Sequence, residues 1–289
     1  MKFAHLSSRL AVGGVAAALA TAGLVGVTST SASAVPVSTT YTCALPAPFG
    51  NQDFPVTVDI ALLPSTAPAG FPVPAGLLSF KSTITVPPAV AGALTTVDGA
   101  KSDDFSTSFG SATAKAPVVW NGAVVTNGDG SKTISGTGAN GAFQLPAAGS
   151  YAVNMPKQFT LIPTSGGAPF PVTPTCTSAA PTKIGDIVLS KQASKVKAKA
   201  PKSVKKGAVV SVKGKVTNDY VKDGGPAATG KLIIKDGKKK VGKGKLKNGK
   251  FTIKVKGLAV GSHKLVVTYK GDDFTDKGKS KAIKVNVTK

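Results

Sequence analysis

Alternation of apolar and polar side chains near the C-terminus is the sequence feature that most constrains the fold. Phe251, Ile253 and Val255 are separated by single polar residues, and the same spacing recurs across 265–269. A period of two places successive side chains on opposite faces of a β-strand, so each segment is expected to have one buried face. Because lysine fills many of the intervening positions, the opposite face is expected to be strongly positive.

Short turn signals separate these segments. Asp236-Gly237 and Asn248-Gly249 are dipeptides that suit tight turns with positive φ angles. Gly271-Asp272 follows the last apolar run. The region 230–273 is therefore predicted to be an antiparallel meander with lysine on its solvent face.

Charge divides the chain into two parts. The whole sequence has a net charge of +23, with 36 Lys+Arg and 13 Asp+Glu. Residues 181–289 hold 29 Lys and 7 Asp, a charge of +22, whereas residues 35–180 hold 5 Lys and 6 Asp, a charge of −1. Two modules with different tasks are expected, and their Gly, Pro, Thr, Ser and Val content favours an all-β fold.

The first 34 residues have the features of a signal peptide. Lys2 and Arg9 precede an apolar Ala/Gly-rich run, and Ala32-Ser33-Ala34 offers a cleavage site. An uncleaved membrane anchor is the alternative. The expectation is an exported mature chain with no transmembrane segment and no covalent anchor visible in its sequence.

The two cysteines lie near the ends of the neutral module, 35–180. In an exported chain, Cys43 and Cys176 are expected to form a structural disulfide, with a free or metal-bound thiol as the alternative. Between them, short apolar runs such as 56–60, 84–86 and 118–120 alternate with turn dipeptides, which predicts a β-sandwich. Turns are expected at Asn121-Gly122, 127–130 and Asn140-Gly141.

The arrangement Y-T-C at 41–43, V-x-V-x-I at 56–60 and a closing Cys176 resembles an uncharacterised β-sandwich domain of secreted actinobacterial proteins. The resemblance implies export and a cell-envelope setting, and it implies no activity.

The neutral module has few candidate catalytic residues. The chain has no Glu, and Asp103-Asp104 is the one adjacent carboxylate pair in this module. Neighbouring strand residues point to opposite faces, so these two are expected in a solvated turn. Asp129, among glycines, falls short of a calcium ligand set. No catalytic residue, metal ligand or cofactor is therefore expected.

A linker at 181–192 is expected to lead into a lysine-rich module at 193–289. The motif G-x-H-x-L-x-V-x-Y-x-G-D-D-F at 261–274, with K-x-G-x-V-V-S-V upstream at 205–212, resembles a bacterial Ig-like repeat. This resemblance implies a seven-strand sandwich used for spacing and adhesion in surface proteins. In such a fold, Tyr269 is expected in the core or as a tyrosine-corner-like clasp, and His263 without a metal role. Asp272-Asp273 is expected to cap a loop, with calcium binding as the alternative.

The lysines of this module permit two interpretations. Lysine on strands blocks edge-to-edge pairing and keeps a protein soluble. Alternatively, a charge of +22 binds a polyanion such as a teichoic-type wall polymer, acidic polysaccharide, anionic lipid or extracellular DNA. Arg9 is the only arginine, so sequence-specific nucleic-acid recognition is not expected. The candidate polyanion-binding residues are Lys238, Lys239, Lys240, Lys243, Lys245, Lys247, Lys250, Lys254 and Lys256.

Together these features predict an all-β protein of two β-sandwich domains behind a signal peptide, the C-terminal domain being immunoglobulin-like. The expected function is non-enzymatic: a secreted, envelope-associated structural or adhesion protein bound to anionic wall polymers. The alternatives are a soluble extracellular polyanion or DNA binder, and an enzyme or inhibitor with its site in the neutral module.

Overall fold

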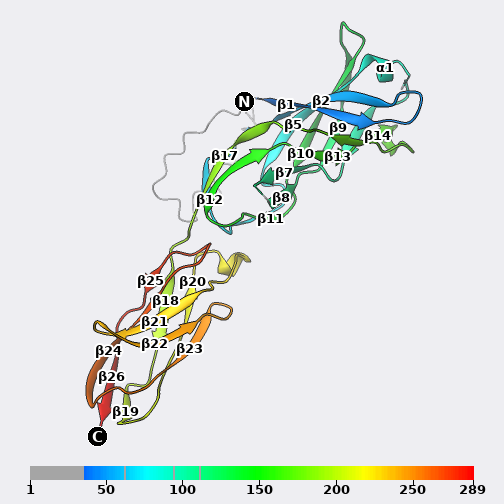
Figure 1. The fold of residues 1–289 in the computed structure, drawn as a ribbon. Coiled ribbons are helices and arrows are strands. Elements are labelled where there is room, and N and C mark those ends of the chain that lie inside the picture. Colours follow the sequence, from blue (N-terminus) through cyan, green and yellow to red (C-terminus); the bar gives the residue numbers. More distant parts are fainter. Residues whose placement is uncertain (1–35, 62, 94, 111) are drawn as a thin grey trace, which may run out of the picture. The chain divides into compact units, whose positions relative to one another are not determined.

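The structure is a computed structural model that describes residues 36–289 except 62, 94 and 111 (Figure 1). The expected signal peptide, 1–34, lies outside the described residues. Within them the chain is almost entirely β, and its helices are the short α1 (Pro88–Ala91) and the 3-10 turn η1 (Val221–Asp223). The all-β prediction is confirmed.

The N-terminal module contains strands β1 to β17. Their bounds are β1 (Val37–Ala44), β2 (Asn51–Asp59), β3 (Thr66–Pro68), β4 (Pro72–Val73), β5 (Ser79–Val86), β6 (Gly99–Ser102), β7 (Ser106–Phe109), β8 (Ala112–Lys115), β9 (Val118–Thr126), β10 (Lys132–Ala139), β11 (Phe143–Gln144), β12 (Gly149–Asn154), β13 (Gln158–Thr160), β14 (Ile162–Ser165), β15 (Ala168–Pro169), β16 (Thr175–Thr177) and β17 (Lys183–Ser190). A ten-stranded sheet has the order β13-β16-β1-β2-β5-β10-β9-β6-β14-β15, a five-stranded sheet has the order β3-β17-β12-β7-β8, and β11 pairs with β4.

Alternate residues of these strands build the module's core. Along β1, Tyr41 and Cys43 are buried while their neighbours in the strand are exposed. Trp120 of β9 is fully buried, and its indole N–H donates to the Ser82 hydroxyl at 3.0 Å. That hydroxyl donates in turn to the Thr57 carbonyl, so the polar atoms carried into this core have partners.

A disulfide joins Cys43 to Cys176, as expected. The two residues lie directly opposite each other in the antiparallel pair β1–β16, and both side chains are fully buried. The bond therefore ties the first strand to a three-residue strand 133 positions later in the chain.

Two of the turns expected in this module are absent. Strand β9 runs straight through Asn121-Gly122, where a Cβ on Gly122 would lie 2.8 Å from the Ser135 carbonyl oxygen. Glycine therefore serves a close strand approach there, not a turn. Asn140 is buried and acts as a loop anchor: it accepts from the Leu78 N–H at 2.7 Å and donates to the Pro74 carbonyl at 2.8 Å. The turn at 127–130 is confirmed, since it joins the paired strands β9 and β10.

A strand occupies most of the segment 181–192, where the sequence predicts a linker. Strand β17 pairs with β12 along its length and with β3 at its end. Its buried residues Ile187 and Leu189 pack in an apolar cluster of the N-terminal module. The aliphatic residues of this strand are visible in the sequence, but Pro181 before it and the lysine-rich segment after it led to the prediction of a linker.

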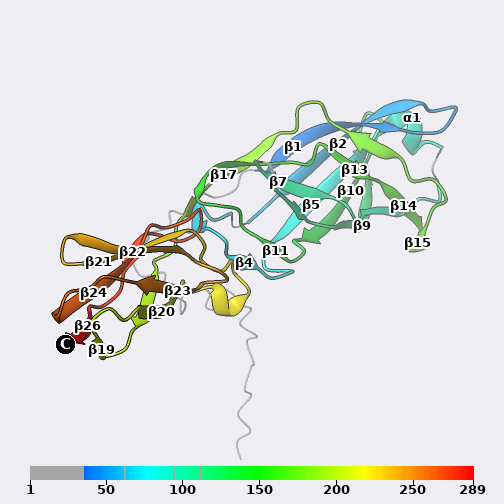
Figure 2. The ribbon, with the colours of Figure 1, turned by 60° about the horizontal axis from the view of Figure 1, so that its bottom comes forward.

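The C-terminal module is a sandwich of two sheets (Figures 1 and 2). Its strands are β18 (Lys195–Lys199), β19 (Ser203–Lys205), β20 (Val210–Thr217), β21 (Lys231–Asp236), β22 (Lys239–Lys245), β23 (Lys250–Val255), β24 (Gly261–Tyr269), β25 (Gly278–Lys279) and β26 (Ile283–Thr288). One sheet has the order β18-β20-β23; the other has the order β19-β26-β24-β21-β22, with β25 also paired to β24. Apart from the short β19 and β25, seven strands form the sandwich, as the resemblance implied.

The meander predicted for 230–273 is wrong at one strand. Strand β21 pairs with β22 and β24, but β23 pairs with β20 in the opposite sheet. The chain crosses between the sheets at Asn248 and Gly249, whose φ angles are 50° and 70°. Gly244 faces inward on β22, where a Cβ would lie 2.7 Å from the Ile253 side chain, so glycine allows β22 to pack closely on β23.

Candidate functional site

The adjacent carboxylates of the N-terminal module, Asp103 and Asp104, do not share a hydrogen-bond partner. The carboxylates of Asp103 and Asp104 have different partners: Asp103 lies 2.9 Å from the Lys101 ammonium, and Asp104 accepts from the Thr160 N–H and hydroxyl at 2.8 Å each. Burial raises the pKa of Asp104, but the hydrogen bonds from Thr160 outweigh it and hold that pKa below its usual value. Both residues belong to a turn, as expected.

One cavity in the described part of this module is small and apolar. An apolar cavity of about 30 Å³ lies among residues such as Ile60, Phe80 and Val153, and it has room for roughly one water molecule. Across the described ranges of the whole chain, no group of three or more His, Cys, Asp or Glu side chains could hold a metal ion.

All nine candidate lysines are exposed, but they do not form one face. Lys239, Lys240, Lys243 and Lys245 belong to β22 in the six-stranded sheet, whereas Lys250 and Lys254 belong to β23 in the three-stranded sheet. Because β22 and β23 are adjacent edges of opposite sheets, the lysines form a band around that edge of the sandwich. The single lysine-covered face predicted from the sequence is therefore wrong, since it assumed one continuous sheet.

A denser lysine surface lies on the outer face of the three-stranded sheet. Here Lys197 of β18 lies opposite Lys215 of β20, and Lys215 lies opposite Lys250 of β23. Lys199 and Lys213 form the next cross-strand pair. We call six exposed lysines of this outer face the lysine face: Lys197, Lys199, Lys213, Lys215, Lys250 and Lys254. Lys195 is exposed on the same face of β18, but it pairs with Asp219 and is left out of this set.

Sequence analysis missed four members of the lysine face. Lys197 and Lys199 alternate with apolar residues in the sequence, and so do Lys213 and Lys215, which predicts exposure but not neighbours. Only the register of β18, β20 and β23 shows that lysines of three separate segments form a row.

Carboxylates do not neutralise this surface. Among the described residues, none of the six lysines of the lysine face and none of the nine candidate lysines lies within 4.0 Å of a carboxylate oxygen. The aspartates of the module have other partners: Asp219 pairs with Lys195, Asp223 lies 3.9 Å from Lys222, and Asp236 contacts His263. The lysine face therefore presents uncompensated positive charge.

Asp272 caps a loop, as expected. One carboxylate oxygen accepts from the backbone N–H groups of Phe274 and Thr275, and the other accepts from the N–H and hydroxyl of Thr229. Burial raises the pKa of Asp272, but these backbone N–H groups outweigh it, so that pKa lies below its usual value. These contacts give the carboxylate a structural role without calcium. Tyr269 is fully buried in the core beside it.

His263 is held between two acceptors. Its Nδ1 lies 2.6 Å from a carboxylate oxygen of Asp236, and its Nε2 lies 2.8 Å from the Ala259 carbonyl oxygen. Both ring nitrogens can donate only when the imidazole is protonated. The Asp236 hydrogen bond, followed by that of Ala259, accordingly raises the pKa of His263 above its ordinary value of 6.5.

We expect the stability of the C-terminal module to fall with increasing pH because of His263. A pKa that is higher in the folded state adds stability that is fully present below the unfolded pKa of 6.5 and is lost as pH rises through the folded pKa. Urea unfolding of the mature chain, followed by hydrogen exchange in β24, should show this decline between mildly acidic and mildly alkaline pH. His263→Gln should remove it. A decline of equal size in His263→Gln would contradict the assignment.

The fold defines an all-β protein that ends in an Ig-like sandwich, and comparison of sequence families agrees. Residues 196–288 match the bacterial Ig-like domain (group 3). Residues 40–185, about half of the chain, match a family of unknown function (DUF6801). The chain belongs to that family. No curated protein matches the chain.

Two solved structures show a distant likeness. One is from Corynebacterium diphtheriae and is described as a membrane anchored protein; at 15% identity and a TM-score of 0.36, the match covers 88% of this chain and 59% of that chain. The other is the BSP domain of a biofilm associated protein, with 9% identity, a TM-score of 0.26, and coverage of 88% of this chain and 52% of that chain. This chain therefore spans less than two thirds of either structure, and TM-scores this low carry no argument about fold or function.

The helices of the described chain are too short to cross a membrane. Within 36–289, apart from 62, 94 and 111, no helix is both long enough and apolar enough to span a membrane.

Proposed function

We propose that this chain is an exported, non-enzymatic protein of the bacterial cell envelope, held there by electrostatic binding of its lysine face to an anionic envelope polymer. The Ig-like module supplies a rigid sandwich, and the strands of the three-stranded sheet present the charge. The family match to a bacterial Ig-like domain supports a structural role.

The row Lys197–Lys215–Lys250 is the observation that carries this proposal. Like charges directly opposite each other on neighbouring strands are destabilising. Edge protection and solubility require lysines on a surface, but they do not require three of them in register across a sheet. A linear polyanion relieves this repulsion, because it places negative charges along the row and releases counterions as it binds.

Neutralising three lysines of the lysine face, two of which belong to the row, should weaken polymer binding and stabilise the fold. In the variant Lys213→Gln/Lys215→Gln/Lys250→Gln, we expect weaker binding to a purified wall fraction. The binding constant should also fall less steeply as the salt concentration rises, because fewer anionic groups are neutralised. Lys215→Gln alone should raise the free energy of unfolding by about 0.2–1 kcal/mol at low salt, because it removes the middle charge of the row. Sedimentation with the wall fraction over a salt series, together with urea unfolding, measures both effects.

A matched control is available in the N-terminal module. Lys81→Gln/Lys115→Gln/Lys157→Gln changes the net charge equally at exposed positions of that module. If this control lost as much binding as the lysine-face variant, the attraction would depend on total charge and not on the lysine face.

Fractionation of producing cells tests the envelope role itself. Protein retained at low salt should be released by a step to about 1 M salt, where the screening length falls to about 3 Å. Protein found entirely in the medium at low salt would contradict retention. It would favour the alternative that the lysines serve to keep the protein soluble. Equal binding to DNA duplexes of unrelated sequence is expected, since the mature chain lacks arginine.

A further inference from the structure

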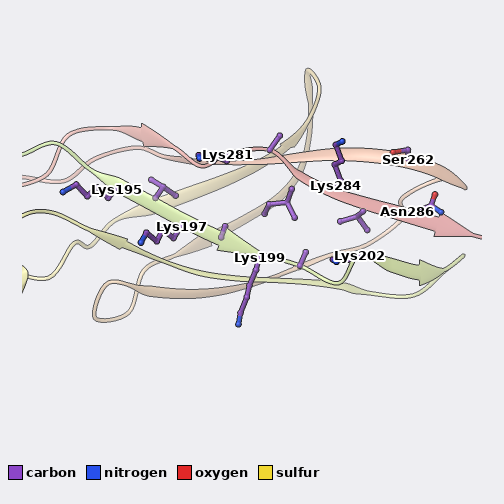
Figure 3. Close-up of a pocket in the computed structure, with 14 residues that line it drawn as sticks. Lys195, Lys197, Lys199, Lys202, Ser262, Lys281, Lys284 and Asn286 are labelled. Atoms are coloured by element: carbon purple, nitrogen blue, oxygen red, sulfur yellow. The ribbon is translucent and has the colours of Figure 1, made fainter.

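A cavity of about 1,000 Å³ opens on the C-terminal module between β18 of one sheet and β26 of the other (Figure 3). Its apolar lining includes Val196, Ala198, Ile283 and Val285. Six lysines and no carboxylate complete the lining, together with Ser262 and Asn286; these lysines are Lys195, Lys197, Lys199, Lys202, Lys281 and Lys284. An apolar interior with a basic rim is a lining that suits an amphipathic ligand bearing negative charge.

Two strand edges that face this cavity have no strand partner among the residues that the structure describes. Within that part of the chain, β18 pairs only with β20, so its other edge is free. Residues 283–285 of β26 pair with β24, whereas β19 pairs with β26 only from Asn286 onward. A free edge presents backbone N–H and C=O groups that can pair with an added strand.

The size of the cavity fits one extended chain. Five residues along β18 span about 16 Å at ~3.3 Å per residue. Over that length, the volume corresponds to a mean cross-section of about 60 Å². A single strand between packed sheets takes about 48 Å², from a spacing of ~4.8 Å across the sheet and ~10 Å between sheets.

We propose that this cavity, which we call the β18–β26 groove, binds an extended segment of another protein in which acidic and small apolar residues alternate. The segment adds as a strand to the free edge of β18. Its apolar side chains face the half-buried Val196 and Ile283, and its acidic side chains face the lysines of the rim. This site shares Lys197 and Lys199 with the lysine face, but it differs from the proposed polymer site because it recognises backbone and alternation in addition to charge.

Two nearer candidates for the groove are disfavoured, namely a second copy of the protein and a segment of this same chain. A second copy would bring its own β18 lysines opposite these, and like charges opposed across strands repel. The chain cannot supply the segment from its own sequence, because it contains no Glu and no two Asp residues separated by a single position. Charge complementarity therefore favours a partner with an acidic, alternating sequence.

Two peptides of about seven residues, with blocked termini, test the proposal against the mature chain. One alternates glutamate and valine; the other has the same composition with its glutamates in one block. Fluorescence anisotropy should show binding of the alternating peptide about tenfold tighter than that of the block peptide, because only alternation places every glutamate at the lysine rim. An alternating peptide with N-methyl groups on the edge that pairs with β18 should lose binding, and hydrogen exchange at 195–199 should slow only with the unmethylated peptide.

Two triple variants separate this site from the lysine face. Lys202→Gln/Lys281→Gln/Lys284→Gln should weaken binding of the alternating peptide about tenfold and leave wall-polymer binding nearly unchanged. Lys213→Gln/Lys215→Gln/Lys250→Gln has the same net charge and should weaken wall-polymer binding while leaving binding of the alternating peptide nearly unchanged. The proposal would be overturned if the two peptides bound equally or if neither bound. It would also be overturned if Lys202→Gln/Lys281→Gln/Lys284→Gln lost wall-polymer binding, because the groove would then be part of the polymer-binding surface.

Discussion

Replacing both cysteines, as Cys43→Ala/Cys176→Ala, is expected to lower the free energy of unfolding of the N-terminal module by about 2–5 kcal/mol. The disulfide closes a loop with a sequence separation of 133, and in the chain-entropy model a loop of this size contributes on the order of 4–5 kcal/mol. Strand β16 has three residues, so only a few backbone hydrogen bonds to β13 and β1 hold it in register besides the disulfide.

Trp120 makes this expectation measurable in the intact protein. It is the only tryptophan of the chain and is fully buried in the N-terminal module, so its fluorescence reports the unfolding of that module alone. The urea midpoint should fall in the double variant, and reduction of the native protein should cause a similar fall. A midpoint that changes by less than the equivalent of about 1 kcal/mol would show that the strand pairing suffices without the bond.

Substitution Gly214→Ala is expected to destabilise the C-terminal module by about 1–3 kcal/mol. A Cβ at this position would lie 2.2 Å from the Lys197 carbonyl oxygen and 2.6 Å from the Phe251 ring. Because the first of these atoms is backbone of β18, relief requires a strand shift that disturbs the lysine face and the groove together. At an open strand position, replacing glycine with alanine would instead raise the free energy of unfolding by about 0.5–1 kcal/mol. A fall in stability therefore shows that the close contact exists.

Hydrogen exchange of β20 and β23 under urea measures this effect, with Trp120 fluorescence expected to stay unchanged. Lys213→Ala is the matched control, since it lies beside Gly214 on the same strand but points to solvent. A variant Gly214→Ala that was as stable as the control would contradict the packing of Phe251 over Gly214.

Local chemistry was enough to predict much of the C-terminal module. The alternation at Phe251, Ile253 and Val255 predicted a strand with one buried face, and all three are buried. The turn at Asp236-Gly237 follows from the positive φ angle that glycine adopts without strain, 56° at Gly237. The pairing of Cys43 with Cys176 followed from counting, because the chain has two cysteines.

Other local signals misled because they have more than one physical cause. At Gly122 the absence of a Cβ permits a close approach of β10, and at Asn140 the side chain satisfies buried backbone groups. Both residues also suit turns, and nothing nearby in the sequence distinguishes these uses. The strand at 183–190 was missed although it contains four branched aliphatic residues, because it lies between Pro181 and a lysine-rich segment where a linker was expected.

The sequence by itself determined the all-β fold, the charge of each module and the exposure of its lysines, because these depend on composition and on a period of two along one segment. Only the tertiary structure decided which lysines are neighbours. The row of Lys197, Lys215 and Lys250 and the free edges beside the β18–β26 groove depend on strand register and on which sheet each strand joins. Those are contacts between distant segments, and the packing of the whole core sets them.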